Sequence, residues 1–225
     1  LDKNYVDKTD FEVLQPAIDY YQGHGTATDK LRTYYYQGRI YQNQQKHDEL
    51  ALQCFVKAVT EGATSDDILT KARVLFTQGR IYSTIYEWDK CISAYLEAAE
   101  YFKHMGRTSS YVNCIADVIN AYTIIGDTVQ AGKYIALAQE NLDGCSAKIK
   151  AHFYSNYLTY VVNYKQKEND IQTVIDNYIN LSRASGTDWL SVANSYLKIG
   201  DVSAAMDALS HHKEVLNTSQ RVKNY

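Results

Sequence analysis

The sequence predicts an all-α protein built from repeated helix hairpins, and three observations lead to this expectation. The 225 residues include one proline and 11 glycines, which is too little turn chemistry for a sandwich or barrel of many short strands. Apolar residues recur with the three- and four-residue spacing of one helix face. A set of aromatic, small and large apolar residues also returns at matching offsets along the chain, which indicates internal repeats.

The first element expected is a helix over residues 9–21. Pro16 should interrupt or kink this helix, because proline cannot donate a backbone hydrogen bond. The glycines at positions 23 and 25 should end it. We expect residues 1–27 to cover the open apolar edge of the first repeat, since terminal repeats need a cap.

Residues 28–216 are predicted to contain five repeat units, four of them well matched. A tyrosine marks each matched unit: Tyr41, Tyr82, Tyr122 and Tyr196. A large residue stands seven positions before each tyrosine: Tyr34, Leu75, Ile115 and Trp189. A small residue stands nine or ten positions after each tyrosine, and a large residue stands four positions after the small one. These pairs are Ala51 and Phe55, Cys91 and Tyr95, Ala131 and Ile135, and Ala205 and Leu209. Because residues spaced by three, four and seven share a helix face, each unit is predicted to be an antiparallel pair of helices with the marker tyrosine in its core.

Glycines within and between the predicted helices support this interpretation. A glycine inside a helix costs about 1 kcal/mol relative to alanine, so Gly38 and Gly79 should let a neighbouring helix come close. Gly126 and Gly200 are each followed by aspartate, which predicts a left-handed helix end and then the cap of the next helix. A weaker unit over residues 147–183 keeps the apolar spacing but loses the small residues.

These units resemble tetratricopeptide repeats. The first unit carries the pattern of that family at Tyr34, Gln37, Gly38, Tyr41, Ala51 and Phe55. The resemblance implies a single right-handed α-solenoid domain of about five hairpins plus the N-terminal capping helix, with residues 217–225 starting a further helix. The segments 2–7 and 34–41 also resemble bacterial envelope-associated proteins of this family. That resemblance implies a cell-envelope or periplasmic location and a lipoprotein or other membrane association, with the cytoplasm as the alternative.

Several classes of function are disfavoured by charge and motifs. The formal net charge is −3 and the isoelectric point is near 6.1, whereas a general nucleic-acid binder carries a basic excess. The sequence holds no apolar run long enough to span a membrane and no fingerprint of a known catalytic, cofactor or metal site. Cys54, Cys91, Cys114 and Cys145 lack zinc-ligand spacing, and their disulfide state stays open. We therefore predict a protein that is not an enzyme and needs no cofactor or metal.

Arginine and aromatic residues recur on the first helix of the first two units. The candidate partner-binding residues are Arg32, Tyr35, Arg39, Arg73, Phe76 and Arg80, followed by Asn113 and Asn120 in the third unit. In tetratricopeptide families, equivalent positions on the inner helices bind partners. This implies a concave face that takes an acidic segment or a C-terminal carboxylate, which the planar guanidinium of arginine suits. The alternative is that these arginines pair with acidic residues of neighbouring helices or keep a long face soluble.

The predicted function is a non-catalytic scaffold that binds a protein or peptide, as part of a longer bacterial protein. One alternative is a sensory or regulatory segment of a membrane-anchored signalling or transcription-regulating protein. A second alternative is a small-molecule pocket in the concave face. The sequence leaves open whether the chain is a monomer or a homodimer.

Overall fold

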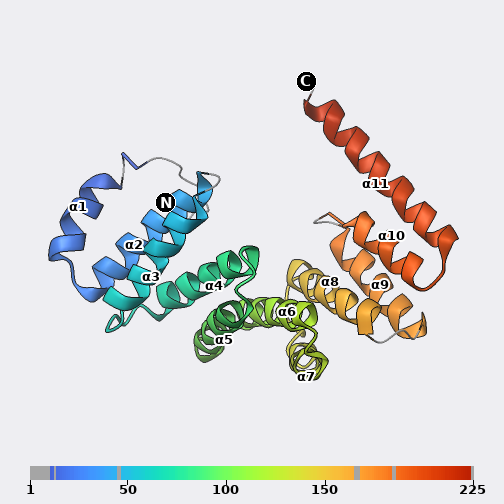
Figure 1. The fold of residues 1–225 in the computed structure, drawn as a ribbon, viewed down its shortest axis with the longest axis horizontal. Coiled ribbons are helices and arrows are strands. Elements are labelled where there is room, and N and C mark those ends of the chain that lie inside the picture. Colours follow the sequence, from blue (N-terminus) through green and yellow to red (C-terminus); the bar gives the residue numbers. More distant parts are fainter. Residues whose placement is uncertain (1–10, 13, 45–46, 165–167, 184–185, 224–225) are drawn as a thin grey trace. The chain divides into compact units, whose positions relative to one another are not determined.

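The computed structural model of the chain consists of helices joined by turns and short loops in the residues that it describes, which are 11–12, 14–44, 47–164, 168–183 and 186–223. Eleven helices, α1 to α11, follow one another along these residues (Figure 1). The chain divides into two compact units, Leu1–Ala121 and Tyr122–Tyr225, with the boundary inside α6. Whether they act as the single domain expected from the sequence stays a prediction.

The first unit consists of a leading helix, two complete hairpins and the start of a third. Its helices are α1 (Gln15–His24), α2 (Ala27–Asn43), α3 (Asp48–Glu61), α4 (Ile68–Thr84), α5 (Trp88–His104) and most of α6 (Thr108–Ile125). The α2–α3 and α4–α5 pairs make the most extensive contacts, and α1 packs against α2. Helix α4 also contacts both α2 and α3, so successive hairpins stack within this unit.

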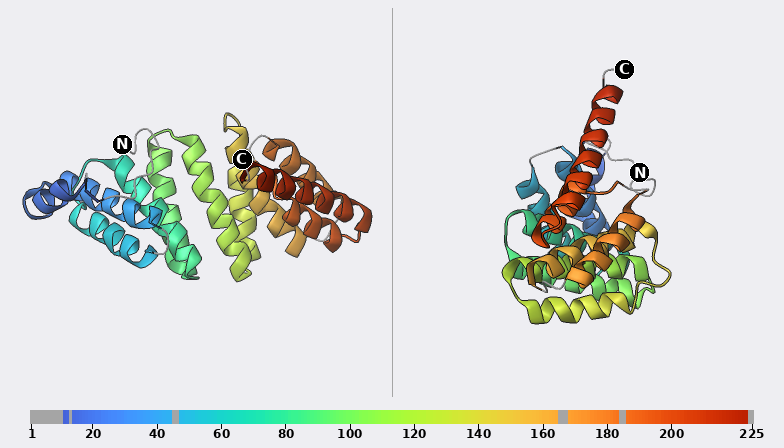
Figure 2. Two further views of the ribbon diagram at one scale, coloured as in Figure 1. Left: turned by 90° about the horizontal axis from the view of Figure 1, so that it is seen from above. Right: turned by 90° about the vertical axis from the view of Figure 1, so that its right-hand side faces the viewer.

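The second unit continues the pattern. It contains the end of α6, then α7 (Thr128–Gln139), α8 (Ala147–Tyr164), α9 (Glu168–Ser182), α10 (Trp189–Lys198) and α11 (Val202–Lys223). The α8–α9 and α10–α11 pairs are hairpins, and α10 also contacts α8 and α9 (Figure 2). The weaker unit predicted over residues 147–183 corresponds to α8 and α9. The prediction of five hairpins preceded by one helix is confirmed.

The helix glycines have the packing role that the sequence predicts. A Cβ atom at Gly38 would lie 2.5 Å from Cε1 of Phe55, and one at Gly79 would lie 2.9 Å from the ring of Tyr95. Each glycine therefore lets an aromatic ring of the second helix lie directly on the backbone of the first. Phe55 is fully buried in a core that also contains Leu31.

The four marker tyrosines lie less deeply than expected. Tyr41, Tyr82, Tyr122 and Tyr196 are only half-buried. Each occupies the last turns of its helix, where the hairpin ends and fewer neighbours cover the ring. The residues seven positions earlier in the first three units, Tyr34, Leu75 and Ile115, are buried. The repeat register is correct, but the marker tyrosines lie at the edge of the core rather than inside it, as Tyr41 does where it packs against the core of the first hairpin.

The N-terminal helix starts later than predicted. Helix α1 begins at Gln15, and Pro16 lies in its first turn rather than in its interior, where the missing N–H has no helical partner to lose. Residues 11–12 and 14 form a bend and turns, and the helix ends at His24 next to Gly25, as expected. The segment 2–7 lies outside the described residues.

The end of the chain also differs from the prediction. Helix α11 runs from Val202 to Lys223 without interruption, so no separate helix starts at residue 217. Its sequence contains neither glycine nor proline, and the polar run at residues 217–219 is therefore not enough to break it. None of the described helices is both long enough and apolar enough to cross a membrane.

The cysteines are free thiols and are all buried. Cys54 lies on α3, Cys91 on α5 and Cys114 on α6, whereas Cys145 lies between α7 and α8. Burial raises the pKa of Cys54 to about 11 and that of Cys91 to about 12. These thiols stay protonated and pack as small apolar side chains.

Candidate functional site

Arg32 connects the first hairpin to the second. Its Nε donates to Oδ2 of Asp67 at 2.6 Å, with the arginine side chain 55% exposed and the aspartate side chain 13% exposed. Asp67 also caps α4 by accepting a hydrogen bond from the backbone N–H of Thr70. Burial raises the pKa of Asp67, but the hydrogen bonds from Thr70 and Arg32 outweigh it and hold the pKa below its usual value. For this residue, the alternative of pairing with a neighbouring helix is the one observed.

Tyr35 is not a surface residue. Its side chain is buried, with the ring centroid 6.2 Å from that of Phe55 and 5.2 Å from that of Tyr36. It faces α3 across the hairpin because it follows Tyr34 on the wide apolar side of α2. The expectation that Tyr35 contacts a partner is therefore wrong.

The remaining candidate residues lie at or near the surface of the first helices. Arg39 is half-buried and donates from Nη1 to Oε1 of Gln42 at 2.8 Å. Arg73 and Phe76 are half-buried on α4, and Arg80 is exposed on the same helix. The Phe76 ring packs 5.5 Å from that of Tyr95.

Two asparagines extend this set to the third hairpin. Asn113 and Asn120 are both half-buried on α6. We call Arg39, Arg73, Phe76, Arg80, Asn113 and Asn120 together the first-helix surface. Because α2 and α4 contact each other, we expect the arginines at equivalent positions on these two helices to lie on one side of the first unit.

Charged groups of neighbouring helices act on the buried Tyr95 of α5. The hydroxyl of Tyr95 is buried, and burial together with the nearby Asp117 carboxylate raises its pKa well above the ordinary value, while Arg80 opposes this shift. Asp117 also raises the pKa of Cys91 and Cys114, although burial is the larger cause for both thiols. These groups lie on α4, α5 and α6. Asp117 is a single aspartate on a helix and belongs to no sequence pattern, so nothing in the sequence marks it.

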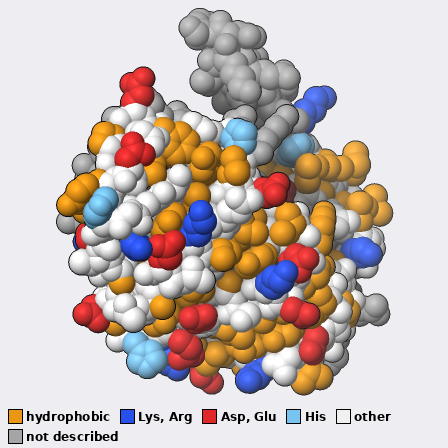
Figure 3. Space-filling model, turned by 60° about the vertical axis from the view of Figure 1, so that its left-hand side comes forward, with side chains coloured by type: hydrophobic (Ala, Val, Ile, Leu, Met, Phe, Trp, Pro, Cys, Tyr) orange, Lys and Arg blue, Asp and Glu red, His pale blue; other side chains and the backbone are white. Residues whose placement is uncertain are grey.

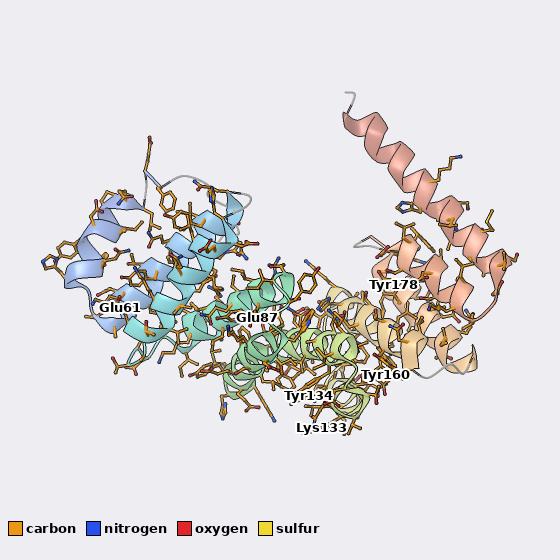
Figure 4. The ribbon with its side chains drawn as sticks, viewed as in Figure 1. Glu61, Glu87, Lys133, Tyr134, Tyr160 and Tyr178 are labelled. Atoms are coloured by element: carbon orange, nitrogen blue, oxygen red, sulfur yellow. The ribbon has the colours of Figure 1, made fainter. Side chains whose placement is uncertain are left out.

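A polar cluster holds the first hairpin together. The hydroxyl of Tyr34 donates to Oε1 of Glu61 at 3.0 Å, and Nζ of Lys30 lies 3.0 Å from the other oxygen (Figure 4). Burial and the Glu61 carboxylate raise the pKa of Tyr34 to about 12. These three side chains tie the start of α2 to the end of α3, which is a structural role.

Metal-ligating side chains do not gather in the part of the chain that the structure describes. Within it, no three His, Cys, Asp or Glu side chains lie close enough to hold a metal ion. On the face drawn in Figure 3, side chains of both charges are interspersed with hydrophobic ones.

A protein-family model matches most of the chain. A family model described as "SNAP: Soluble NSF attachment protein, SNAP" matches residues 12–181. This range contains α1 to α8 and all of α9 except its last residue. None of the curated proteins matches the chain.

Proposed function

The chain belongs to the soluble NSF attachment protein (SNAP) family, whose members are non-catalytic adaptors with a tetratricopeptide-like α-solenoid fold, and from this membership we propose that it binds NSF and SNARE proteins in membrane fusion. The observation that carries the proposal is the match over the first helix and four of the five hairpins. SNAP proteins are cytosolic and associate peripherally with membranes, so we propose the same location here. The family match does not support the bacterial envelope context expected from short motifs.

The first-helix surface is our proposed contact for one of these partners. Arg80 is exposed, and Arg39 and Arg73 are half-buried beside it on contacting helices. A guanidinium group with a fixed planar set of donors binds a carboxylate through two hydrogen bonds. The first-helix surface therefore fits an acidic segment of a SNARE protein, in agreement with the acidic partner expected from the sequence.

The role of such an adaptor is to position its partners. Buried rings and polar contacts hold the helices of each hairpin in place and so keep the arginines at fixed separations. Little free energy of binding is then spent on ordering the backbone that carries them. Since the contact is charged and near water, its strength should fall as salt screens it.

The proposal is tested with immobilised SNARE complex and purified full-length chain. We expect the Arg39→Ala/Arg80→Ala variant to bind about tenfold more weakly than the wild type, and the difference to shrink in high salt. The matched control is Lys103→Ala/Arg107→Ala, which removes the same charge from exposed positions at the end of α5 and just after it.

Two outcomes count against parts of the proposal. Equal losses in both double variants would mean that only the overall charge matters and would remove the first-helix surface from the proposal. A folded wild-type chain that binds neither SNARE complex nor NSF would overturn the adaptor function itself.

A further inference from the structure

Three hairpin turns of this chain share one backbone conformation. In the α4–α5 turn, the N–H of Glu87 donates to the carbonyl of Tyr82 at 3.0 Å and that of Tyr86 to Ser83 at 3.3 Å. The other two turns have the same pair of hydrogen bonds with nearly the same lengths. The N–H donors are those of Asp127 and Gly126 in the α6–α7 turn, and those of Asp201 and Gly200 in the α10–α11 turn. This is the hydrogen-bond pattern of a helix that ends in a left-handed residue.

The α4–α5 turn differs from the other two at the left-handed position. Gly126 and Gly200 adopt φ angles of 82° and 84°, as glycine does without steric cost. Tyr86 occupies the equivalent position with a φ of 62° and is the only non-glycine residue with positive φ among the described residues. A side chain with a Cβ atom is strained there, and a bulky aromatic residue especially so.

Glu87, the residue after Tyr86, also differs from its counterparts in the other two turns. Asp127 and Asp201 each cap the following helix by accepting a hydrogen bond from a backbone N–H three residues on. Glu87 makes no such bond with the start of α5. Its carboxylate instead lies 3.2 Å from Nζ of Lys90, in an exposed ion pair (Figure 4). Tyr86 and Glu87 therefore lack the local stabilisation that the equivalent residues of the other two turns have.

Packing does not explain these departures. The Tyr86 side chain is 76% exposed, and its ring lies edge-on to that of Trp88 with centroids 6.0 Å apart. Trp88 is half-buried, so it is Tyr86 that combines an exposed ring with a strained backbone, and strain of this kind is retained for function at recognition sites.

We propose that the α4–α5 turn, residues 85–89, is a docking site for a basic and apolar segment of a partner protein. The rings of Tyr86 and Trp88 offer apolar contact and attract cations to their faces. Glu87 and Asp89, the residues before and after Trp88, add two carboxylates against the single cation of Lys90, and this acidic excess favours lysine or arginine in the partner. The same carboxylates disfavour an anionic lipid surface.

This site is distinct from the first-helix surface proposed above. It lies at the end of the hairpin and has the opposite charge preference, so it would take a different segment or a different partner. Its failure would leave the adaptor function untouched, because the two tests use different variants and different probes.

The experiment titrates the full chain with a fluorescein-labelled helical peptide of leucine and lysine, and with its counterpart that has glutamate in place of lysine. We expect the lysine peptide to bind at least tenfold more tightly than the glutamate peptide. Tyr86→Gly should weaken its binding at least fivefold and raise the Tm by about 2–4 °C, because glycine relieves the strain. Tyr86→Phe should bind like the wild type.

Two further variants separate the ring from the strain. Tyr86→Ala removes the ring but keeps a Cβ atom at positive φ, so it should lose binding without a rise in Tm. Tyr20→Ala removes another exposed tyrosine, which is 59% exposed on α1 of the same unit, and should leave binding unchanged.

The proposal is overturned by any of four results. The lysine peptide fails to bind, both peptides bind alike, or Tyr86→Gly binds like the wild type. The fourth result is that vesicles of phosphatidylcholine with phosphatidylserine, but not of phosphatidylcholine alone, bind in a Tyr86-dependent way, which would identify a lipid surface instead.

Discussion

The two units of the molecule fix their helices by different means. In the first unit, an aromatic ring of the second helix lies on a glycine of the first, as Phe55 does on Gly38. In the second unit, α8 uses tyrosine hydroxyls: Tyr164 donates to the carbonyl of Thr123 at 2.9 Å, and Tyr160 to that of Thr128 at 3.3 Å. The first arrangement depends on shape and the second on directed hydrogen bonds. The glycine contact lies within one hairpin, whereas the tyrosine hydrogen bonds join α8 to the end of α6 and the start of α7 in the hairpin before it.

Truncation of a glycine-contacting ring should give the largest effect. Phe55 is fully buried, so Phe55→Ala should lower the free energy of unfolding by about 3–5 kcal/mol. Tyr82→Ala, at a half-buried marker position, should cost only about 1–2 kcal/mol. Urea unfolding followed by circular dichroism measures both. Equal losses would mean that the marker tyrosines belong to the core after all.

Glycine-to-alanine substitutions should have opposite signs in the two units. Gly38→Ala places a Cβ atom 2.5 Å from the Phe55 ring, and the overlap should outweigh the helix preference of alanine, with a net loss of about 1–3 kcal/mol. At Gly132 on α7, a Cβ atom would lie 3.5 Å from the Tyr160 hydroxyl, an ordinary contact. Gly132→Ala should therefore stabilise by up to about 1 kcal/mol.

The denaturation midpoints of these two variants decide the comparison. Stabilisation by both substitutions would show that the ring of Phe55 moves aside at little cost and that shape does not fix the first hairpin.

Removal of the two hydroxyls should affect the second unit moderately. The Tyr160→Phe/Tyr164→Phe variant keeps both rings but leaves two carbonyls without these donors, which should cost about 1–2 kcal/mol in total. Tyr20→Phe, at an exposed ring, is the control and should be neutral. An unchanged thermal midpoint in the double variant would contradict the role of these hydrogen bonds.

The smallest effect concerns two helix caps, one in each unit. The pKa values of Asp67 and Asp188 are both lowered because hydrogen bonds from the first turns of their helices outweigh the effect of burial. Only Asp67 has an ion pair with arginine, Arg32. Since a carboxylate with a depressed folded-state pKa stabilises above its unfolded pKa, both contributions are present at neutral pH and are lost as the pH falls below about 4.

Arg32→Ala should therefore raise the pKa of Asp67 toward its ordinary value and leave that of Asp188 unchanged. The stability that Asp67 contributes above its unfolded pKa should decrease accordingly. Carboxyl carbon chemical shifts, followed by NMR through an acid titration, give both values separately. Parallel shifts of the two aspartates would point to a general structural change instead of a lost ion pair.

The sequence predicted the hairpins and their register well. Gly38 and Gly79 interrupt amphipathic helices at equivalent positions, and a close ring contact is the reason that physical chemistry offers for such glycines. The glycine–aspartate pairs of the later turns likewise specify both the helix end and the next cap. Helix ends and caps of this kind can be predicted from the sequence because the residues that cause them lie within a few positions of one another.

The burial of individual side chains, and the pairing of residues far apart in the sequence, could not be predicted in the same way. The repeat register aligns Tyr82 with its counterparts but does not say how far the neighbouring helices extend, and this extent decides its burial. Tyr35 looked like a surface residue for the same reason. The Arg32–Asp67 pair joins residues from different hairpins, and no local pattern selects Asp67 over the adjacent Asp66. A left-handed Tyr86 has no sequence signature, because tyrosine is rarely found there.

The buried cysteines make the opening of individual hairpins measurable. Cys54, Cys91 and Cys114 lie in three successive hairpins, and a buried, protonated thiol does not react with alkylating reagents. Each thiol becomes reactive only when its own hairpin opens, because local segments of a protein unfold with their own free energies. Pulse alkylation of the wild-type chain followed by mass spectrometry would therefore give the order in which these hairpins open, without any mutation.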